Sequence, residues 1–241
     1  TEDQVAAMGT AQLAALTTAQ LAKMETDDIA AITTAQITAL KTAQMEALTT
    51  AQVVALSEDQ VATLTTAQLA ALTTAQLAKM ETDDIAAITT AQITALTTAQ
   101  IAALTTAQAV AISEDQVAVL KTAQLAALTT ANFVEMSTDQ LAAITTAQIS
   151  ALTTAQVSAL TEDQAVSLSE DQVAALKTAQ VAALSTANLA AMSEDQVAAL
   201  TTAQVTALTT AQIVALTEDQ VAAMGTAQLA ALTTAQLAKM E

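Results

Sequence analysis

Cysteine, histidine, proline, tryptophan and tyrosine are all absent from this chain of 241 residues. The absence of cysteine excludes disulfides and thiolate metal sites. Without histidine and cysteine, the commonest general bases, nucleophiles and transition-metal ligands are also missing. We therefore expect that the protein is not an enzyme, that it has no catalytic residues and that it binds no organic cofactor.

Aromatic residues and glycine are almost as scarce. Phe133 is the one aromatic residue, and Gly9 and Gly225 are the two glycines, although 53% of the residues are hydrophobic. Aromatic side chains are usually the largest pieces of a core. A core made from alanine, valine, leucine and isoleucine must therefore be thin.

Basic residues are few as well: six lysines stand against 24 acidic residues, which gives a formal charge of −18. Nucleic acids and anionic membranes are bound through basic patches, so we expect neither as a partner. Polar residues interrupt every apolar run well before the length of about 18 residues that a membrane span needs. We therefore predict no membrane insertion.

What the chain does contain is an eight-residue repeat. Counted from Thr1, thirty octads fill the chain with one residue left over, and residues 65–72 show the consensus Thr-Thr-Ala-Gln-(Leu/Val/Ile)-Ala-Ala-(Leu/Met/Ile). Position eight is always Leu, Met or Ile. Position four is glutamine in 26 of the 30 octads, and the exceptions are Asp28, Asp84, Asn132 and Asn188.

Position five is large and apolar in every octad but two. The exceptions, Ala109 and Ala165, are each followed by a valine, Val110 or Val166. We interpret this as a packing constraint in which the apolar bulk moves by one position and is kept.

A longer period overlies the octads. Octads that end in methionine recur at Met24, Met80, Met136 and Met192, 56 residues apart. We therefore expect one continuous octapeptide-repeat array over residues 1–241, with super-repeats near 9–64, 65–120, 121–176 and 177–224. Because residues 1–25 recur unchanged at 217–241, we also expect that the chain is a segment of a longer array.

Most octads have the signature of a helix start, and we read every octad as one short helix with its cap at position one. Ser or Thr followed three residues later by Gln is typical of a capping box, in which the hydroxyl and the amide satisfy free backbone groups at the first turn. Ala, Leu, Gln and Met then favour helix. Helices this short are not stable alone, so successive coils must share a core. We also expect the glutamines to form a ladder between coils.

These features predict an all-α repeat, a solenoid of very short capped helices with one helix per octad. One long helix is excluded, because eight residues at about 100° each would sweep the apolar stripe round the helix axis. A β-solenoid stays open as the alternative. Acidic octads recur mostly every three or four octads, which indicates about 3–4 octads per coil and about two coils per super-repeat.

The acidic octads also hold the candidate metal ligands. Carboxylates in the first turn of each helix are most simply explained by the helix dipole. The functional alternative is hard-cation binding, since Ca²⁺ takes six to eight oxygen ligands. The candidate calcium ligands are Asp27, Asp28, Asp59, Asp83, Asp84 and Asp115.

Stretches such as Leu96 to Leu104, Leu-Thr-Thr-Ala-Gln-Ile-Ala-Ala-Leu, resemble the Thr/Ala/Gln-rich octapeptide arrays of very large bacterial surface or secreted adhesin-like proteins. The resemblance covers the whole chain and implies an extracellular or cell-surface location. It implies a structural, non-catalytic role as a fibre, filament or adhesin stalk that self-associates end to end or laterally. The alternative is a binding module that presents a repetitive acidic or Thr-rich face to divalent cations, glycans or a surface.

Overall fold

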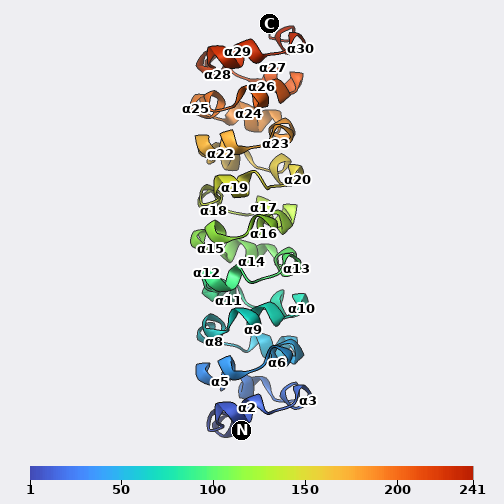
Figure 1. Ribbon diagram of the computed structural model, residues 1–241, viewed down its shortest axis with the longest axis vertical. Coiled ribbons are helices and arrows are strands. Elements are labelled where there is room, and N and C mark those ends of the chain that lie inside the picture. The colour runs from blue at the N-terminus through green and yellow to red at the C-terminus, as the bar shows by residue number, and fades with distance from the viewer. Residues whose placement is uncertain (241) are drawn as a thin grey trace. The chain divides into compact units, whose positions relative to one another are not determined.

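The computed structural model describes residues 1–240. The chain divides into two compact units, Thr1–Leu128 and Thr129–Glu241. Each unit is a stack of coils built from short helices (Figure 1).

Every octad contains one helix. In the first unit the helices are α1 (Glu2–Ala6), α2 (Thr10–Ala14), α3 (Thr18–Leu21), α4 (Thr26–Ala30), α5 (Thr34–Ala39), α6 (Thr42–Ala47), α7 (Thr50–Val54), α8 (Glu58–Thr63), α9 (Thr66–Ala71), α10 (Thr74–Leu77), α11 (Thr82–Ala87), α12 (Thr90–Ile93), α13 (Thr98–Ala102), α14 (Thr106–Ala111), α15 (Glu114–Val119) and α16 (Thr122–Ala127).

In the second unit the helices are α17 (Thr130–Val134), α18 (Thr138–Ala142), α19 (Thr146–Ile149), α20 (Thr154–Ser158), α21 (Glu162–Val166), α22 (Glu170–Ala175), α23 (Thr178–Ala183), α24 (Thr186–Ala191), α25 (Glu194–Ala198), α26 (Thr202–Ala207), α27 (Thr210–Ala215), α28 (Glu218–Ala223), α29 (Thr226–Ala231) and α30 (Thr234–Leu237). No strand occurs among residues 1–240, so the all-α solenoid is confirmed and the β-solenoid alternative is wrong.

The helices begin where the capping boxes predict. In α9 the hydroxyl of Thr65 accepts a hydrogen bond from the Gln68 backbone N–H at 3.2 Å, and Gln68 Oε1 accepts one from the Thr65 backbone N–H at 2.8 Å. These reciprocal bonds satisfy backbone groups that a helix start leaves free. The first residue of the octad is therefore the cap, and the helix begins at the second.

The corners between helices need no glycine. Leu72, the last residue of its octad, has φ −61° and ψ 139°, and Thr73, the first of the next, has φ −70° and ψ 159°. Any residue can adopt such extended backbone, and no residue in the described part of the chain has a positive φ. This geometry explains how the chain turns a corner every octad with only two glycines.

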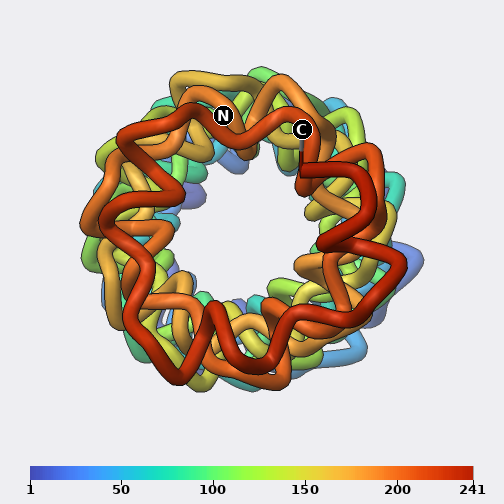
Figure 2. Tube along the Cα trace, turned by 90° about the horizontal axis from the view of Figure 1, so that it is seen from above, coloured from blue at the N-terminus to red at the C-terminus, as the bar shows by residue number. Residues whose placement is uncertain are grey.

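Helices three octads apart pack on one another, as α5, α8, α11 and α14 do in the first unit and α20, α23, α26 and α29 do in the second. Glutamine side chains donate hydrogen bonds to backbone 28 and 31 residues earlier. In each unit the chain therefore runs round successive circuits, as the view from above shows (Figure 2). Both spacings confirm a coil of three to four octads.

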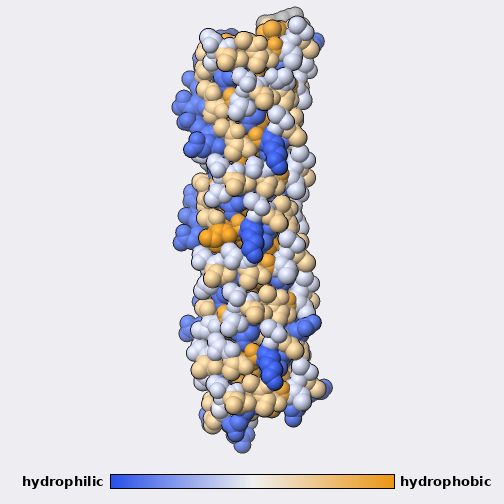
Figure 3. All heavy atoms as spheres, viewed as in Figure 1, coloured by the Kyte–Doolittle hydropathy of each residue, from blue (hydrophilic) through white to orange (hydrophobic). Residues whose placement is uncertain are grey.

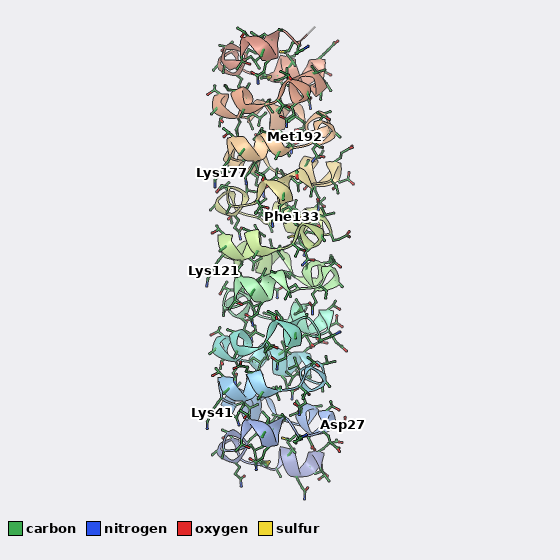
Figure 4. The ribbon with its side chains drawn as sticks, turned by 90° about the vertical axis from the view of Figure 1, so that its right-hand side faces the viewer. Asp27, Lys41, Lys121, Phe133, Lys177 and Met192 are labelled. Atoms are coloured by element: carbon green, nitrogen blue, oxygen red, sulfur yellow. The ribbon has the colours of Figure 1, made fainter. Side chains whose placement is uncertain are left out.

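The core of each unit consists of positions five and eight. In the octad 65–72, Leu69 is fully buried and Leu72 is 3% exposed, while the alanines between them lie near the surface. Phe133 and Met192 lie in the interior of the second unit (Figure 4). Aliphatic side chains and methionines fill nearly all of these positions, and Phe133 is the one aromatic residue among them.

The interpretation of Ala109 and Ala165 is wrong. Both alanines occupy the buried position, whereas Val110 and Val166 are each 47% exposed. Successive residues of a helix point about 100° apart, so a side chain at position six cannot replace one at position five. The apolar bulk moves to the surface in these two octads and is not kept in the core.

Candidate functional site

The feature that holds each unit together is a ladder of glutamine side chains. Gln68 is 2% exposed and uses both ends of its amide. Its Oε1 caps its own helix, and its Nε2 donates to the carbonyls of Ile37 at 2.7 Å and Leu40 at 2.8 Å in the coil before. One side chain therefore joins the start of a helix to the corner of the preceding coil.

The same register recurs along both units. In the second unit Gln212 donates to the carbonyls of Val181 at 2.9 Å and Leu184 at 2.8 Å, again 31 and 28 residues earlier. The acceptors common to the glutamine rungs are the fifth and eighth residues of an octad, and in several rungs the carbonyl of the sixth residue accepts as well. The ladder expected between coils is confirmed, but its rungs run from glutamine to backbone. Because every residue has a backbone carbonyl, the sequence pattern does not identify the acceptors. The expected coil length of about 28 residues is the one feature of the sequence that relates to their position.

The length of the glutamine side chain is needed for both bonds. Asn188 is one methylene shorter, and its Nδ2 still donates to the Leu160 carbonyl at 2.9 Å. Its helix, however, lacks the reciprocal capping box and keeps only the bond from the Asn188 N–H to the Ser185 hydroxyl. A shorter amide can therefore make the coil-to-coil bond but not the cap.

The candidate calcium ligands lie in the first turns of four helices. Asp27 and Asp28 are on α4, Asp59 is on α8, Asp83 and Asp84 are on α11, and Asp115 is on α15. Asp27 points outward (Figure 4), and Asp59, Asp83 and Asp115 are also exposed. Among residues 1–240, no three acidic side chains are grouped so that they could hold a metal ion.

Asp84 differs from the other candidates because it is 3% exposed. It occupies the ladder position, and its Oδ2 accepts a hydrogen bond from the Glu81 N–H at 3.2 Å. Burial raises the pKa of Asp84 to about 6 from its ordinary value of 3.8, against the lowering effect of that bond. The carboxylates of Glu81, Glu58 and Asp83 raise it further, because like charges disfavour ionisation.

Acidic helix starts stack in the second unit, where α22, α25 and α28 pack in succession. Hydrophilic side chains gather along the edge beside these three helices (Figure 3). Glu194, Asp195 and Asp219 line a recess of about 360 Å³ between α25 and α28. This edge is the most acidic surface that the stacking creates in that unit.

The octads match a known repeat in sequence. The ALTTAQ repeat matches residues 21–58, 77–114, 117–154, 133–170, 170–202 and 198–226. The chain belongs to the ALTTAQ repeat family. No curated protein matches it. The resemblance to Thr/Ala/Gln-rich octapeptide arrays is thereby confirmed at the level of the repeat.

The helices of this ALTTAQ array are all short. Within residues 1–240, none has the length and apolar character that crossing a bilayer would require.

The raised pKa of Asp84 predicts that this ALTTAQ array loses stability as pH rises. Below about pH 4 the carboxyl is neutral in both folded and unfolded chains, and above about pH 6 burial penalises the ionised form in the folded chain alone. From pH 4 to pH 7 we expect a loss of roughly 1–3 kcal/mol in the free energy of unfolding that Asp84→Asn does not show. Urea unfolding of both proteins at the two pH values measures it.

The matched control is Asp28→Asn, because octads 25–32 and 81–88 have the same sequence. Asp28 lies in the first coil and its side chain is 20% exposed. If Asp84→Asn and the wild-type chain lost stability equally over this range, burial of Asp84 would not be the cause.

Proposed function

We propose that the chain is a structural, non-catalytic element of an extracellular fibre, filament or adhesin stalk. The observation that carries this proposal is the ladder, which within each unit joins successive coils in the same register. A protein built this way gains length by adding octads, without any change in its local contacts. Length and regularity are the properties that a stalk or fibre requires.

The joint between coils has two different sides. One side presents glutamine amides, such as that of Gln68, and the other presents backbone carbonyls, such as those of Ile37 and Leu40. Contacts between unlike surfaces extend into open filaments when no rotation closes them. This supports end-to-end association of chains through the same bonds that join coils within one chain.

The charge supports end-to-end contact over lateral contact. A net charge of −18 on 241 residues repels parallel neighbours at low salt. The coil edges, by contrast, offer donors and acceptors that complement one another. In the first coil Gln12 and Gln20 are exposed, and each accepts a cap bond, at 2.6 Å and 2.8 Å.

Electron microscopy of the purified 241-residue chain tests the proposal. We expect end-to-end filaments that lengthen with protein concentration. The variant Gln12→Glu/Gln20→Glu keeps an oxygen for each cap but removes the amide donors, so we expect it to form shorter filaments. Gln36→Glu, which removes one donor inside the array, is the matched control. Discrete particles at every concentration, in both wild type and variants, would argue against self-assembly.

The location outside the cell is tested separately, with an antibody against the chain on intact cells of the source organism. Labelling without permeabilisation supports the stalk or fibre. Labelling only after permeabilisation would contradict an extracellular location. The structural role of the array would then have to be exercised inside the cell.

The second candidate is a binding module for divalent cations or glycans. The recess lined by Glu194, Asp195 and Asp219 gives it a polar surface to bind through, but these carboxylates are not grouped so that they could hold a metal ion by themselves. A rise in melting temperature with CaCl₂ that Asp195→Asn/Asp219→Asn abolishes would favour this candidate. An unchanged transition would count against cations as its ligand.

A further inference from the structure

One rung of the ladder in the first unit is built differently from its neighbours. Asp84 stands where the repeat has glutamine, and it is as buried as the glutamines, at 3% exposed. A carboxylate has no N–H to donate. Asp84 therefore keeps the cap bond from Glu81 N–H, at 3.2 Å, and makes no bond to the coil before.

The acceptors that Asp84 faces can be identified from the rungs on either side. Gln76 donates to the Leu48 carbonyl at 2.7 Å, and Gln92 donates to the Leu64 carbonyl at 2.6 Å. The 28-residue register places the Leu56 carbonyl opposite Asp84. No side chain in the described residues donates to it, although Leu56 is only 4% exposed.

The charges around Asp84 add to this loss. Glu81 is the N-cap of its helix and Asp83 lies in the first turn, while Glu58 and Asp59 are on α8, which packs against α11. Helix α14, on the other side of α11, carries no charged residue, and neither does α7. At this rung the Asp84 carboxylate therefore lies near other carboxylates and a backbone carbonyl. In the rungs on either side, a glutamine amide lies between two carbonyl oxygens and donates to them.

We propose that the junction between octads 49–56 and 81–88 is an opening joint of the first unit. Under heat, denaturant or tension the coils part here first, while the glutamine rungs on either side hold. Gln76 and Gln92 also donate to carbonyls 31 residues earlier, so the same register places the Val53 carbonyl opposite Asp84 as well. The Val53 and Leu56 carbonyls have no amide to lose at this junction, so opening breaks two buried hydrogen bonds fewer than at a glutamine rung. Local unfolding of a stack with one weak junction begins at that junction and not at a random position. The joint is a property of the first unit and stands whether or not the protein is a stalk.

Hydrogen exchange of the full chain, read by mass spectrometry, tests the joint. Residues 17–40 and 73–96 have the same sequence, so peptides confined to them cannot be told apart. Exchange is therefore followed in a peptide covering octad 49–56, whose sequence occurs once. In the wild type we expect this octad to exchange faster than octads 41–48 and 57–64.

The deciding variant is Asp84→Gln, which restores the consensus rung. We expect it to slow exchange in octad 49–56 by roughly tenfold to thirtyfold, the effect of regaining two buried hydrogen bonds. Asp28→Gln makes the same change in an identical octad of the first coil, and we expect it to leave octad 49–56 unchanged. Glu58→Gln relieves repulsion without adding a donor to Leu56, so its effect should be smaller than that of Asp84→Gln.

Two results would overturn the proposal. One is wild-type exchange in octad 49–56 as slow as in its neighbours. The other is an Asp84→Gln variant that exchanges no more slowly than wild type, or slows no more than Asp28→Gln does. Neither readout depends on filament formation or on cellular location, so the joint and the proposed function fail or stand separately.

Discussion

Gln68→Ala should lower the free energy of unfolding by about 2–4 kcal/mol, an unusually large effect for a polar side chain. The substitution removes the bond from Thr65 N–H and the bonds to the carbonyls of Ile37 and Leu40, all at a site that is 2% exposed. Each buried polar group that loses its partner costs about 1–3 kcal/mol. Urea unfolding followed by far-UV circular dichroism measures the change.

Gln68→Asn is the matched control, because Asn188 shows which bond the shorter amide keeps. We expect Gln68→Asn to retain the bond to the Leu40 carbonyl and to lose the reciprocal cap and the bond to the Ile37 carbonyl, at a cost of about 1–2 kcal/mol. Equal losses for alanine and asparagine would mean that the cap, and not the ladder, carries the stability.

Phe133→Ala should destabilise the chain still more, by about 3–5 kcal/mol. Phe133 is fully buried in α17 and is the largest side chain in a core made otherwise of aliphatic residues. Truncation removes most of its apolar surface and leaves a cavity that the short helices around it can close only in part. Thermal and urea unfolding of the full chain measure the loss.

Phe133→Leu restores the consensus of the repeat at the same position. We expect it to cost less than about 1.5 kcal/mol, because the change in volume is small and hydrophobic. Val110→Ala, at a side chain that is 47% exposed, should stay within about 0.5 kcal/mol of wild type. A Phe133→Ala variant that melts like Phe133→Leu would show that the core collapses without cost.

The local parts of the fold were predictable because they depend on neighbours in the chain. A capping box joins residues three apart, such as Thr65 and Gln68, and the propensities act on a single octad. The pattern therefore located every helix start, and positions five and eight identified the core. The scarcity of glycine is compatible with a corner in every octad, because the extended backbone of these corners suits any residue.

The candidate site was predictable only in outline. The regularity of position four pointed to a ladder of glutamines, but the backbone acceptors of Gln68 are residues 37 and 40, outside the reach of any local rule. The exposure of Val110 was not predicted either, because the repeat pattern shows that an apolar residue is present but not which face of the helix it occupies. The grouping of acidic residues from α22, α25 and α28 on one edge also depends on how successive coils stack, which the sequence does not show.

Asp28 and Asp84 show most clearly where sequence ends and tertiary structure begins. Their octads, 25–32 and 81–88, are identical, so every local property is the same. The sequence by itself determined the octad, the capped helix and the two apolar positions, because these follow from interactions within eight residues. Only the tertiary structure decided that Asp84 is buried against a preceding coil while Asp28 is not. The burial of a ladder residue depends on which residues of the preceding coil, about 28 positions earlier, the successive corners of the chain place against it.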